Sequence, residues 1–210
     1  SKKISNNGDW AGYVISKQQG DGTLYLSSLV SNARLKVNRA ENLQFSPDSK
    51  YAAFSIKPLY SATREAKIKK KKADEMTRDT LGIANLTSMA VVKIPRVRSY
   101  KFPENGLAYL AYQLEKPVDT SKKAKSPAGT EVKKDLEDYF ADDEPSKADG
   151  LEGSDLVFRN LMTGVERTFK YVSEYTLSKN GKQLVFAATG SKKDAAAKAG
   201  VFLLNVEKGT

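Results

Sequence analysis

Apolar and polar positions alternate along most of the chain with a period of two residues, which is typical of β-strands that bury one face. The alternating runs come in pairs. Each pair flanks a short polar turn rich in Asn, Asp, Gly or Pro, residue types that favour tight turns. This pattern recurs in four segments, at residues 4–14, 45–55, 102–113 and 177–187. The sequence therefore predicts one hairpin that is repeated four times.

Further alternating runs follow each hairpin, two after each of the first three hairpins and one after the fourth. The first of these runs reads TLYLSSL (23–29), TLGIANL (80–86), DLVFRNL (155–161) and GVFLLNV (200–206). After the first three of these, a polar turn leads to another alternating run, at residues 34–39, 89–95 and 165–172. The predicted unit thus has four strands, and we expect the fourth unit to lack its last strand.

The spacing between the two halves of neighbouring units is constant. Seventeen residues separate Leu29 from Ser46, Leu86 from Pro103, and Leu161 from Ser178. The variation in length falls between the second and third strands, at residues 17–22, 57–79, 115–153 and 190–199. In an up-and-down unit, these connections lie at the same end as the links between units. We therefore expect the long charged insertions, 57–79 and 115–153, at that end.

Repeated four-stranded antiparallel units of about 40 residues are typical of a β-propeller. We expect an all-β partial propeller of about four consecutive blades, a single domain over residues 1–210. Its units are expected at about 1–40, 41–97, 98–172 and 173–210. Another repeated antiparallel sheet, such as a sandwich, is the alternative. Closed propellers have about 4–8 complete blades. Because the fourth unit here lacks its last strand, we expect part of a larger propeller, whose unpaired strand edges favour self-association.

Composition matters mainly through what it excludes. The 210 residues contain no cysteine and no histidine. Disulfides, thiolate nucleophiles, a Ser-His-Asp triad and imidazole metal ligands are therefore excluded. No apolar run approaches the roughly 18 residues of a membrane helix. We assign no catalytic, cofactor-binding or metal-binding residues, and we expect no cofactor and no membrane span.

The net charge of +10 is unevenly distributed. A basic cluster, defined as Arg64, Lys67 and residues 69–72, has two interpretations: a patch for phosphates or acidic lipids, or a solvated insertion. Four consecutive lysines would surround a helix instead of sharing one face, which favours the second. Arg96, Arg98 and Tyr100 suggest a nucleic-acid groove, a third and weaker function class, but no row of exposed aromatics accompanies them. We expect no nucleic-acid partner.

The acidic residues give no strong site either. In the segment LEDYFADDEP (136–145), four of them are candidate ligands of a hard cation: Asp138, Asp142, Asp143 and Glu144. The segment lacks the acid spacing and central glycine of a calcium loop, so a solvated loop is favoured. The other candidates for paired-carboxylate chemistry fall near turns or links, and nothing in the sequence brings them together: Glu41, Asp48, Glu104 and Glu174.

The remaining singled-out residues have structural interpretations. Residues 20–22, Gly-Asp-Gly, form a hairpin turn and not a phosphate loop, since no helix follows. Asp48, Asn105 and Asn180 are turn residues. Six aromatic residues fall on second strands, where we expect them to pack between blades: Trp10, Tyr13, Phe54, Tyr109, Tyr112 and Phe186.

The segment FSPDSKYAAF (45–54) resembles the propeller repeats of the translocation protein TolB and of prolyl oligopeptidase-type serine peptidases. Four longer segments resemble the first blades of large exported, dipeptidyl peptidase-like members of the prolyl oligopeptidase family in Bacteroidetes. They are ISNNGDWAGYVI, TREAKIKKKKADEMTRDTLGI, KIPRVRSYKFPENGLAYLAYQLEKP and DLVFRNLMTGVERTF. The resemblance covers essentially the whole chain.

This resemblance implies a propeller that precedes a C-terminal α/β-hydrolase domain with a Gly-x-Ser-x-Gly elbow, an Asp and a His. None of these motifs, and no match to the paired glutamates of dipeptidyl peptidases, occurs here, so no site residue is transferred. The implied role is non-catalytic: the propeller restricts and orients peptide substrates for the hydrolase domain of the same polypeptide. A periplasmic or secreted location is also implied. The alternative is a TolB-like propeller that binds another protein.

Overall fold

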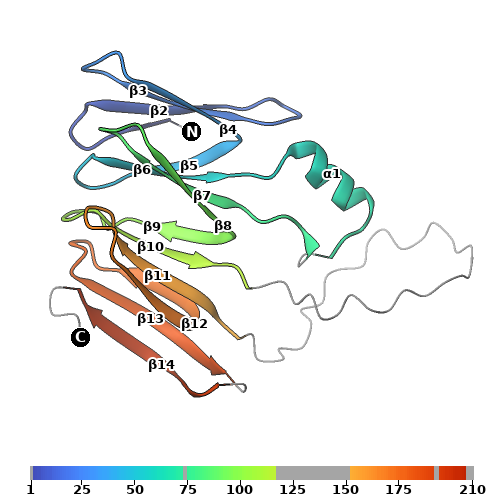
Figure 1. The fold of residues 1–210 in the computed structure, drawn as a ribbon, viewed down its shortest axis with the longest axis vertical. Helices are drawn as coiled ribbons and strands as arrows, with labels where there is room; N and C mark the ends of the chain where they lie inside the picture. The colour runs from blue at the N-terminus through green and yellow to red at the C-terminus, as the bar shows by residue number, and fades with distance from the viewer. Residues whose placement is uncertain (1, 73–74, 117–151, 192–193, 207–210) are drawn as a thin grey trace, which may run out of the picture. The chain divides into compact units, whose positions relative to one another are not determined.

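The computed structural model describes residues 2–72, 75–116, 152–191 and 194–206 of the chain, and these residues belong to one compact unit. The described part is nearly all β, with a single helix, α1 (Tyr60–Ile68). Its strands form three antiparallel sheets, of four, four and six strands (Figure 1). Within every sheet the strands pair in chain order, as an up-and-down arrangement requires.

The strands lie on the alternating runs of the sequence. The first sheet contains β1 (Lys2–Ile4), β2 (Trp10–Ile15), β3 (Thr23–Ser28) and β4 (Arg34–Asn38). The second contains β5 (Ala40–Phe45), β6 (Tyr51–Ile56), β7 (Thr80–Asn85) and β8 (Val91–Pro95). The third contains β9 (Val97–Lys101), β10 (Tyr109–Leu114), β11 (Ser154–Asn160), β12 (Glu166–Leu177), β13 (Gln183–Ser191) and β14 (Asp194–Asn205).

The six-stranded sheet differs from the four separate sheets that the repeat predicts. The difference arises at β12. This single strand combines the last strand of the third repeat unit with the first strand of the fourth, without a break between them. It pairs with β11 up to Val172 and with β13 from Val172 onward, and the register shifts in both pairings. Tyr171 has a φ of 58° at this point, so the chain turns locally without leaving the sheet.

The six-stranded sheet bends back on itself at β12. The Ser99 hydroxyl on β9 lies 3.1 Å from the Tyr175 hydroxyl on β12. The side-chain amide of Gln113, on β10, donates to the Val172 carbonyl at 2.7 Å. In a flat sheet, β9 and β12 would lie three strand spacings apart, about 14 Å. These contacts therefore place β9–β11 face to face with β13 and β14.

Three apolar clusters hold the sheets together. Cluster 1 joins the first and second sheets, cluster 2 joins the second sheet to β9–β11, and cluster 3 joins β10 and β11 to β13 and β14. The largest fully buried apolar side chains are Phe54, Leu24, Leu26, Leu81, Leu110, Leu156, Leu184 and Val172. Every fully buried apolar side chain removed from water contributes about 1.5–3 kcal/mol, so stacking of the sheets is the main source of stability.

A serine begins three of the four hairpin turns and closes each of them. Its hydroxyl donates to the side chain two residues later and accepts the N–H of the residue five positions later. These sets are Ser5 with Asn7 and Trp10, Ser46 with Asp48 and Tyr51, and Ser178 with Asn180 and Gln183. The remaining turn, in the third hairpin, has Pro103 in place of the serine. There the Asn105 N–H donates to the Lys179 carbonyl at 2.8 Å.

Ser46→Ala is expected to lower the free energy of unfolding by about 1–3 kcal/mol, the range for a buried group that loses its partner. Ser46 is fully buried, and alanine leaves the Tyr51 N–H without the hydroxyl that accepts it at 3.0 Å. Urea unfolding followed by circular dichroism measures the loss. Ser178→Ala is the matched control, because its turn is only partly buried and water can replace the hydroxyl. An equal loss in both variants would contradict burial as the cause.

Candidate functional site

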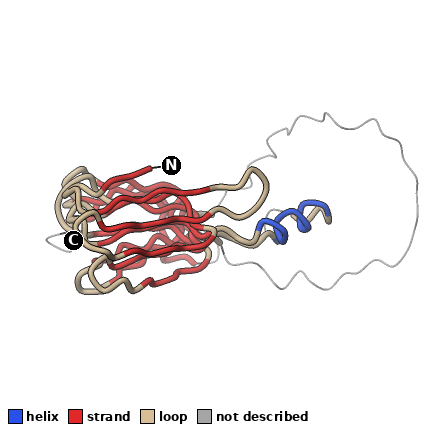
Figure 2. The backbone as a smooth tube through the Cα atoms, turned by 90° about the horizontal axis from the view of Figure 1, so that it is seen from above, coloured by secondary structure: helices blue, strands red, loops and turns tan. Residues whose placement is uncertain are grey.

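One end of the sheets carries the described parts of the two long insertions, residues 57–72, 75–79, 115–116 and 152–153, together with the links between repeat units. Each link contains a residue of positive φ: Arg39, Arg96 and Tyr171, at 63°, 59° and 58°. Hydrogen bonds tie the first two links to the neighbouring connections, from Arg39 N–H to the Gly22 carbonyl (2.7 Å) and from Val97 N–H to the Asp79 carbonyl (3.1 Å). Figure 2 shows α1 at this end, beyond the strands.

A charged cluster lies at this end, on the second sheet. The Lys57 ammonium lies 2.7 Å from an Asp79 carboxylate oxygen and 3.2 Å from a Glu41 oxygen. Burial alone would lower the pKa of Lys57, but the hydrogen bonds and charges of Asp79 and Glu41 outweigh it and raise that pKa. The three side chains come from the two ends of an insertion and from a neighbouring strand, so the sequence alone did not single out Lys57 or Asp79.

This charged cluster borders a cavity of about 450 Å³, which also contacts Arg39, Asp21 and Tyr60. Asp21 accepts the Tyr60 N–H at 2.9 Å and so attaches the start of α1 to the Gly-Asp-Gly turn. Glu41 and Asp79 are each already paired with Lys57. The cavity therefore has the character of a polar joint that fixes the insertion against the first sheet.

Arg96 is fixed by a second joint at the same end. Its guanidinium donates to the Glu115 carbonyl at 2.6 Å, and the Glu115 side chain lies 3.7 Å from the Arg78 guanidinium. Of the two other residues of the nucleic-acid interpretation, Arg98 is exposed and Tyr100 is buried. A buried ring cannot stack on a base, so these three residues do not form the groove that their sequence suggests.

Three buried tyrosines connect strands inside the clusters. The Tyr100 hydroxyl donates to the Asn42 carbonyl, and the Tyr112 hydroxyl to a Glu166 carboxylate oxygen at 3.1 Å. Tyr175 pairs with Ser99, as described above. Burial raises the pKa of Tyr100 to about 12, and burial also raises those of Tyr112 and Tyr175. All three phenols therefore favour the neutral form in the folded chain.

The raised pKa values of these three tyrosines predict that the folded chain loses stability at alkaline pH. A pKa that is higher in the folded than in the unfolded chain gives stability that is complete below the unfolded value, about 10, and is lost as pH rises through the folded value. For Tyr100 alone the loss approaches about 3 kcal/mol above pH 12. A spectrophotometric titration at alkaline pH should show three tyrosines that ionise only with unfolding. Ionisation of all ten in one step near pH 10, with the fold intact, would contradict this.

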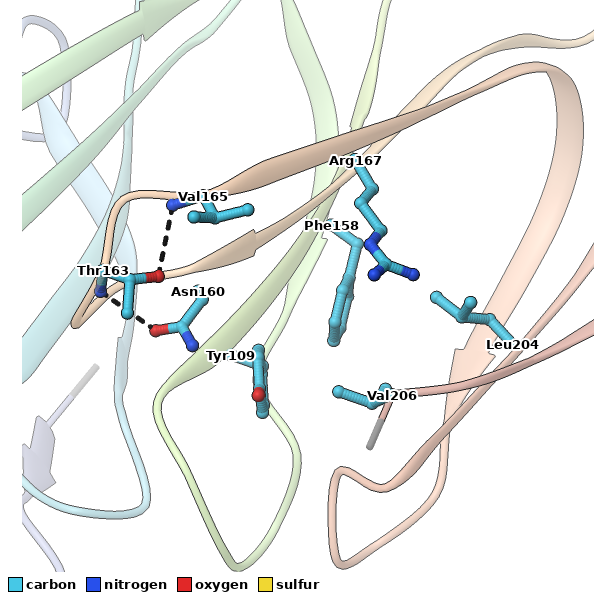
Figure 3. A pocket seen from close by; sticks show the side chains of 8 residues that line it. All are labelled: Tyr109, Phe158, Asn160, Thr163, Val165, Arg167, Leu204 and Val206. Atoms are coloured by element: carbon cyan, nitrogen blue, oxygen red, sulfur yellow. Dashed lines mark hydrogen bonds between the residues drawn. The ribbon is translucent and has the colours of Figure 1, made fainter. Parts of the chain in front are cut away.

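A smaller cavity, of about 230 Å³, lies at the opposite end of the sheets, between β10–β11 and the end of β14 (Figure 3). The Tyr109 ring stacks on Phe158 with centroids 5.0 Å apart. The polar side chains at its rim serve the nearby turn: Asn160 accepts the Thr163 N–H at 3.2 Å, and Thr163 accepts the Val165 N–H at 3.3 Å. This cavity is a gap between packed strands whose polar groups already have structural partners.

The aromatic residues predicted to pack between blades follow that prediction with one exception. Trp10, Phe54, Tyr112 and Phe186 are buried in the clusters, and Tyr109 packs against cluster 3. Tyr13 is 40% exposed and stacks on Tyr25, with centroids 5.4 Å apart. The prediction is wrong for Tyr13 because its face of the first sheet has no neighbouring sheet in the described chain.

The charged candidates do not converge on one site. The basic cluster lies on and directly after α1, which buries none of its residues, and one of its lysines, Lys69, lies 3.8 Å from Glu65. Glu41 borders the larger cavity, whereas Glu104 pairs with Lys179 at the opposite end. Asp48 belongs to a turn, and Glu174 is exposed on β12. The acidic segment 136–145 lies outside the described residues.

Neither metal nor membrane chemistry emerges from the described ranges. Among those residues, no three acidic side chains converge as a metal ion would require. None of their helices has the length and apolar character to cross a bilayer. The charged clusters among these residues hold loops and electrostatic partners in place.

Comparison with solved structures identifies the fold. The chain is similar to the β-propeller domain of the Trilobed protease from Pyrococcus furiosus, with a TM-score of 0.52, 12% identity, and coverage of 98% of this chain and 53% of that one. A prolyl endopeptidase gives 0.51 at 13% identity, over 100% of this chain and 28% of that one. An acylaminoacyl peptidase from Pyrococcus horikoshii gives 0.46 at 15% identity, over 97% and 30%.

Identities this low establish the fold and nothing further. No protein-family model and no curated protein matches the sequence. The chain spans between about a quarter and about a half of the length of these structures. Together with the three stacked antiparallel sheets, the likeness to the β-propeller domain of the Trilobed protease shows the fold of a partial β-propeller.

Proposed function

We propose that the chain is the non-catalytic N-terminal propeller region of a prolyl oligopeptidase-like serine peptidase. In this role it restricts and orients the peptides that reach a hydrolase domain absent from these 210 residues. The observation that carries the proposal is the fold likeness to a protease propeller and to a prolyl endopeptidase, over 98% and 100% of the chain. The absence of histidine and of a Gly-x-Ser-x-Gly elbow agrees with a supporting role.

Within that proposal, the chain contributes four consecutive blades, with units at about 1–40, 41–97, 98–172 and 173–210. The six-stranded sheet would then be two blades joined by the continuous strand β12. Cluster 3 supports this division, because it has the same place between β10–β11 and β13–β14 that clusters 1 and 2 have between separate sheets. We further propose, from the sequence resemblance, that the parent protein is dipeptidyl peptidase-like and is exported to the periplasm or secreted.

The insertion end has a specific part in this proposal. The Lys57 and Arg96 joints hold the start of both long insertions against the sheets, at 2.7 Å from Asp79 and 2.6 Å from the Glu115 carbonyl. Rigid attachment of the first insertion would hold α1 at one end of the propeller (Figure 2). Peptides that approach from that end would meet charged chain before they reach a serine nucleophile in another domain.

The test begins with the coding sequence that follows Thr210. We expect further repeats of the same pattern and then Gly-x-Ser-x-Gly, Asp and His in that order. The encoded polypeptide should cleave short peptides and leave folded proteins intact, and its elbow Ser→Ala variant should lose the activity. The 210-residue chain alone should cleave none of them. Cell fractionation then tests the exported location.

A stop codon within one or two further repeats would overturn the peptidase proposal. The TolB-like alternative would then lead, and capture of an envelope protein by the chain would support it. Steeply salt-dependent binding to polynucleotide would instead indicate a nucleic-acid protein.

A further inference from the structure

The basic cluster on the first insertion combines dense positive charge with exposure to solvent. Six of the nine residues from Arg64 to Lys72 are Lys or Arg, and one is acidic. All six basic side chains are exposed, and α1 buries none of its residues. The acidic residue, Glu65, lies 3.8 Å from Lys69, and both side chains are 68% exposed, so this pair contributes little. The segment therefore presents an excess of positive charge to solvent.

The four consecutive lysines do not surround a helix, because α1 ends before them. Lys69 is the C-cap residue of α1, and Lys70 has a φ of 49°. The Lys70 N–H donates to the Lys67 carbonyl at 2.9 Å, and the Lys71 N–H donates to the Ala66 carbonyl at 3.0 Å. These two hydrogen bonds form a Schellman turn, which keeps the lysine run close to the last turn of α1. The arrangement that favoured a solvated insertion, four lysines around one helix, is therefore not the observed one.

Exposed apolar side chains accompany the basic ones. Leu59 and Tyr60, at the start of α1, are 50% and 42% exposed, and Ile68, at its end, is 70% exposed. Arg64 and Ile68 lie four residues apart and so share one face of the helix. Thr63, on the other side, is only partly exposed and borders the larger cavity. The outward face of α1 thus combines a cation with a large aliphatic side chain.

The insertion is held so that this surface lies beyond the strands (Figure 2). The Lys57 ammonium lies 2.7 Å from an Asp79 carboxylate oxygen, which ties the two ends of the insertion together. Asp21 accepts the Tyr60 N–H at 2.9 Å and fixes the first residue of α1. A flat partner can therefore reach α1 and the lysine run without displacing a strand.

The combination of charge and apolar surface fits one anionic partner better than the others. Lysines near an anionic membrane are attracted to its headgroups, and apolar side chains enter the boundary between headgroups and acyl chains. A polynucleotide would use the charge but not Leu59 or Ile68. It would also need several aromatic rings to stack its bases, and residues 59–72 contain one, Tyr60. Apolar contacts add nothing to the binding of free phosphate.

We propose that residues 59–72 bind the surface of an anionic lipid bilayer. Arg64, Lys67 and the lysine run contact the headgroups, and Ile68 inserts below them. The binding is peripheral and reversible, because the segment is much shorter than a membrane-spanning helix and has few apolar residues to bury. The inference rests on this segment alone and stands apart from the peptidase proposal.

Co-sedimentation of the 210-residue chain with lipid vesicles tests the proposal. At about 0.15 M salt, we expect binding to phosphatidylcholine vesicles that contain about one-third phosphatidylglycerol, and no binding to phosphatidylcholine alone. Replacing all four lysines of residues 69–72 by Gln should weaken the binding on the order of 100-fold or more. Ile68→Gln should weaken it about tenfold, because one large apolar side chain no longer leaves water.

Two matched controls separate the segment from charge and exposure in general. The first replaces four exposed lysines outside the insertion by Gln: Lys50, Lys93, Lys179 and Lys182. It removes the same net charge but should change the binding less than about threefold, because charges far from the bilayer are screened. The second is Val30→Gln, which should bind as the unchanged chain does, because Val30 is 73% exposed but lies in a turn at the opposite end. Circular dichroism should be the same for all variants, since every replaced side chain is exposed.

A fluorescent label can report the insertion of Ile68 directly, because the sequence contains no other attachment site for a thiol-reactive dye. An environment-sensitive label on Ile68→Cys should emit at shorter wavelength when anionic vesicles are added. The same label on Val30→Cys should not change. A shift at both positions, or at neither, would contradict insertion at α1.

Three further results would overturn the proposal. One is a chain that does not bind the anionic vesicles, and another is equal weakening by the two sets of lysine substitutions, which would make net charge the cause. The third is binding that Ile68→Gln leaves unchanged, or a polynucleotide that binds as tightly, either of which would indicate a general polyanion site. The absence of a downstream hydrolase domain would overturn the peptidase proposal and leave these outcomes unaffected.

Discussion

Phe54→Ala is expected to lower the free energy of unfolding by about 3–5 kcal/mol, the range for a buried phenylalanine cut back to alanine. Tyr13→Ala, at the equivalent position of the first unit, should cost less than about 1 kcal/mol. Phe54 has no exposed surface and belongs to cluster 1, between two sheets. Tyr13 is 40% exposed and touches the ring of Tyr25. The difference follows from the neighbouring sheet and not from the residue type.

Urea unfolding at about 1 µM protein measures both losses, because association of copies is negligible at low concentration. The slope of unfolding free energy against urea should match that of the unchanged chain for Tyr13→Ala. Equal losses in the two variants would mean that the position stabilises each unit from within. The repeat would then consist of autonomous sheets, and stacking would not be the main source of stability.

Sequence periodicity predicted the strands well because burial of alternate side chains leaves a direct trace in the residue order. It predicted four sheets where the structure has three, because the link at Tyr171 has the same length as the links at Arg39 and Arg96. Whether the pairing breaks or continues at such a link depends on bulges on both sides of β12. Those register shifts leave no trace in the hydrophobic pattern.

The candidate site was harder to predict than the fold. Lys57 and Asp79 are 22 residues apart and flank an insertion whose length alone gives no contact. Glu41 was recognised as a carboxylate near a link, but its partner became visible only once β5 and β6 were paired. Tyr13 shows the converse. It occupies a repeat position that is buried in the second unit, but it is exposed because its face of the first sheet has no neighbouring sheet in the described chain.

Gly153→Ala is expected to destabilise the chain by about 3 kcal/mol, at the upper end of the cost of forcing extra atoms into a packed site. A Cβ at Gly153 would lie 2.2 Å from the Tyr171 carbonyl oxygen and 2.5 Å from the Val172 carbonyl carbon. Both are backbone atoms of β12 and cannot rotate away as a side chain can. The methyl group would therefore push β11 and β12 apart where the chain passes between units.

Gly153 also links the end of the insertion to the fourth unit, so local hydrogen exchange can detect the effect of the substitution. The Gly153 N–H donates to the Thr189 hydroxyl at 2.8 Å, and that hydroxyl donates to the Tyr171 carbonyl at 3.2 Å. Hydrogen exchange should accelerate at β12 and β13 before it accelerates in the first sheet, because local opening follows the lost contacts.

Gly200→Ala is the matched control for Gly153→Ala. Its added Cβ meets only the Phe202 ring, at 3.6 Å, an ordinary contact distance. Replacing glycine where alanine fits restricts the unfolded chain, so this variant should be unchanged or more stable by up to about 1 kcal/mol. If Gly153→Ala unfolds at the same urea concentration as Gly200→Ala, the close approach at Tyr171 does not exist in solution. The bend of the six-stranded sheet at β12 would then need another explanation.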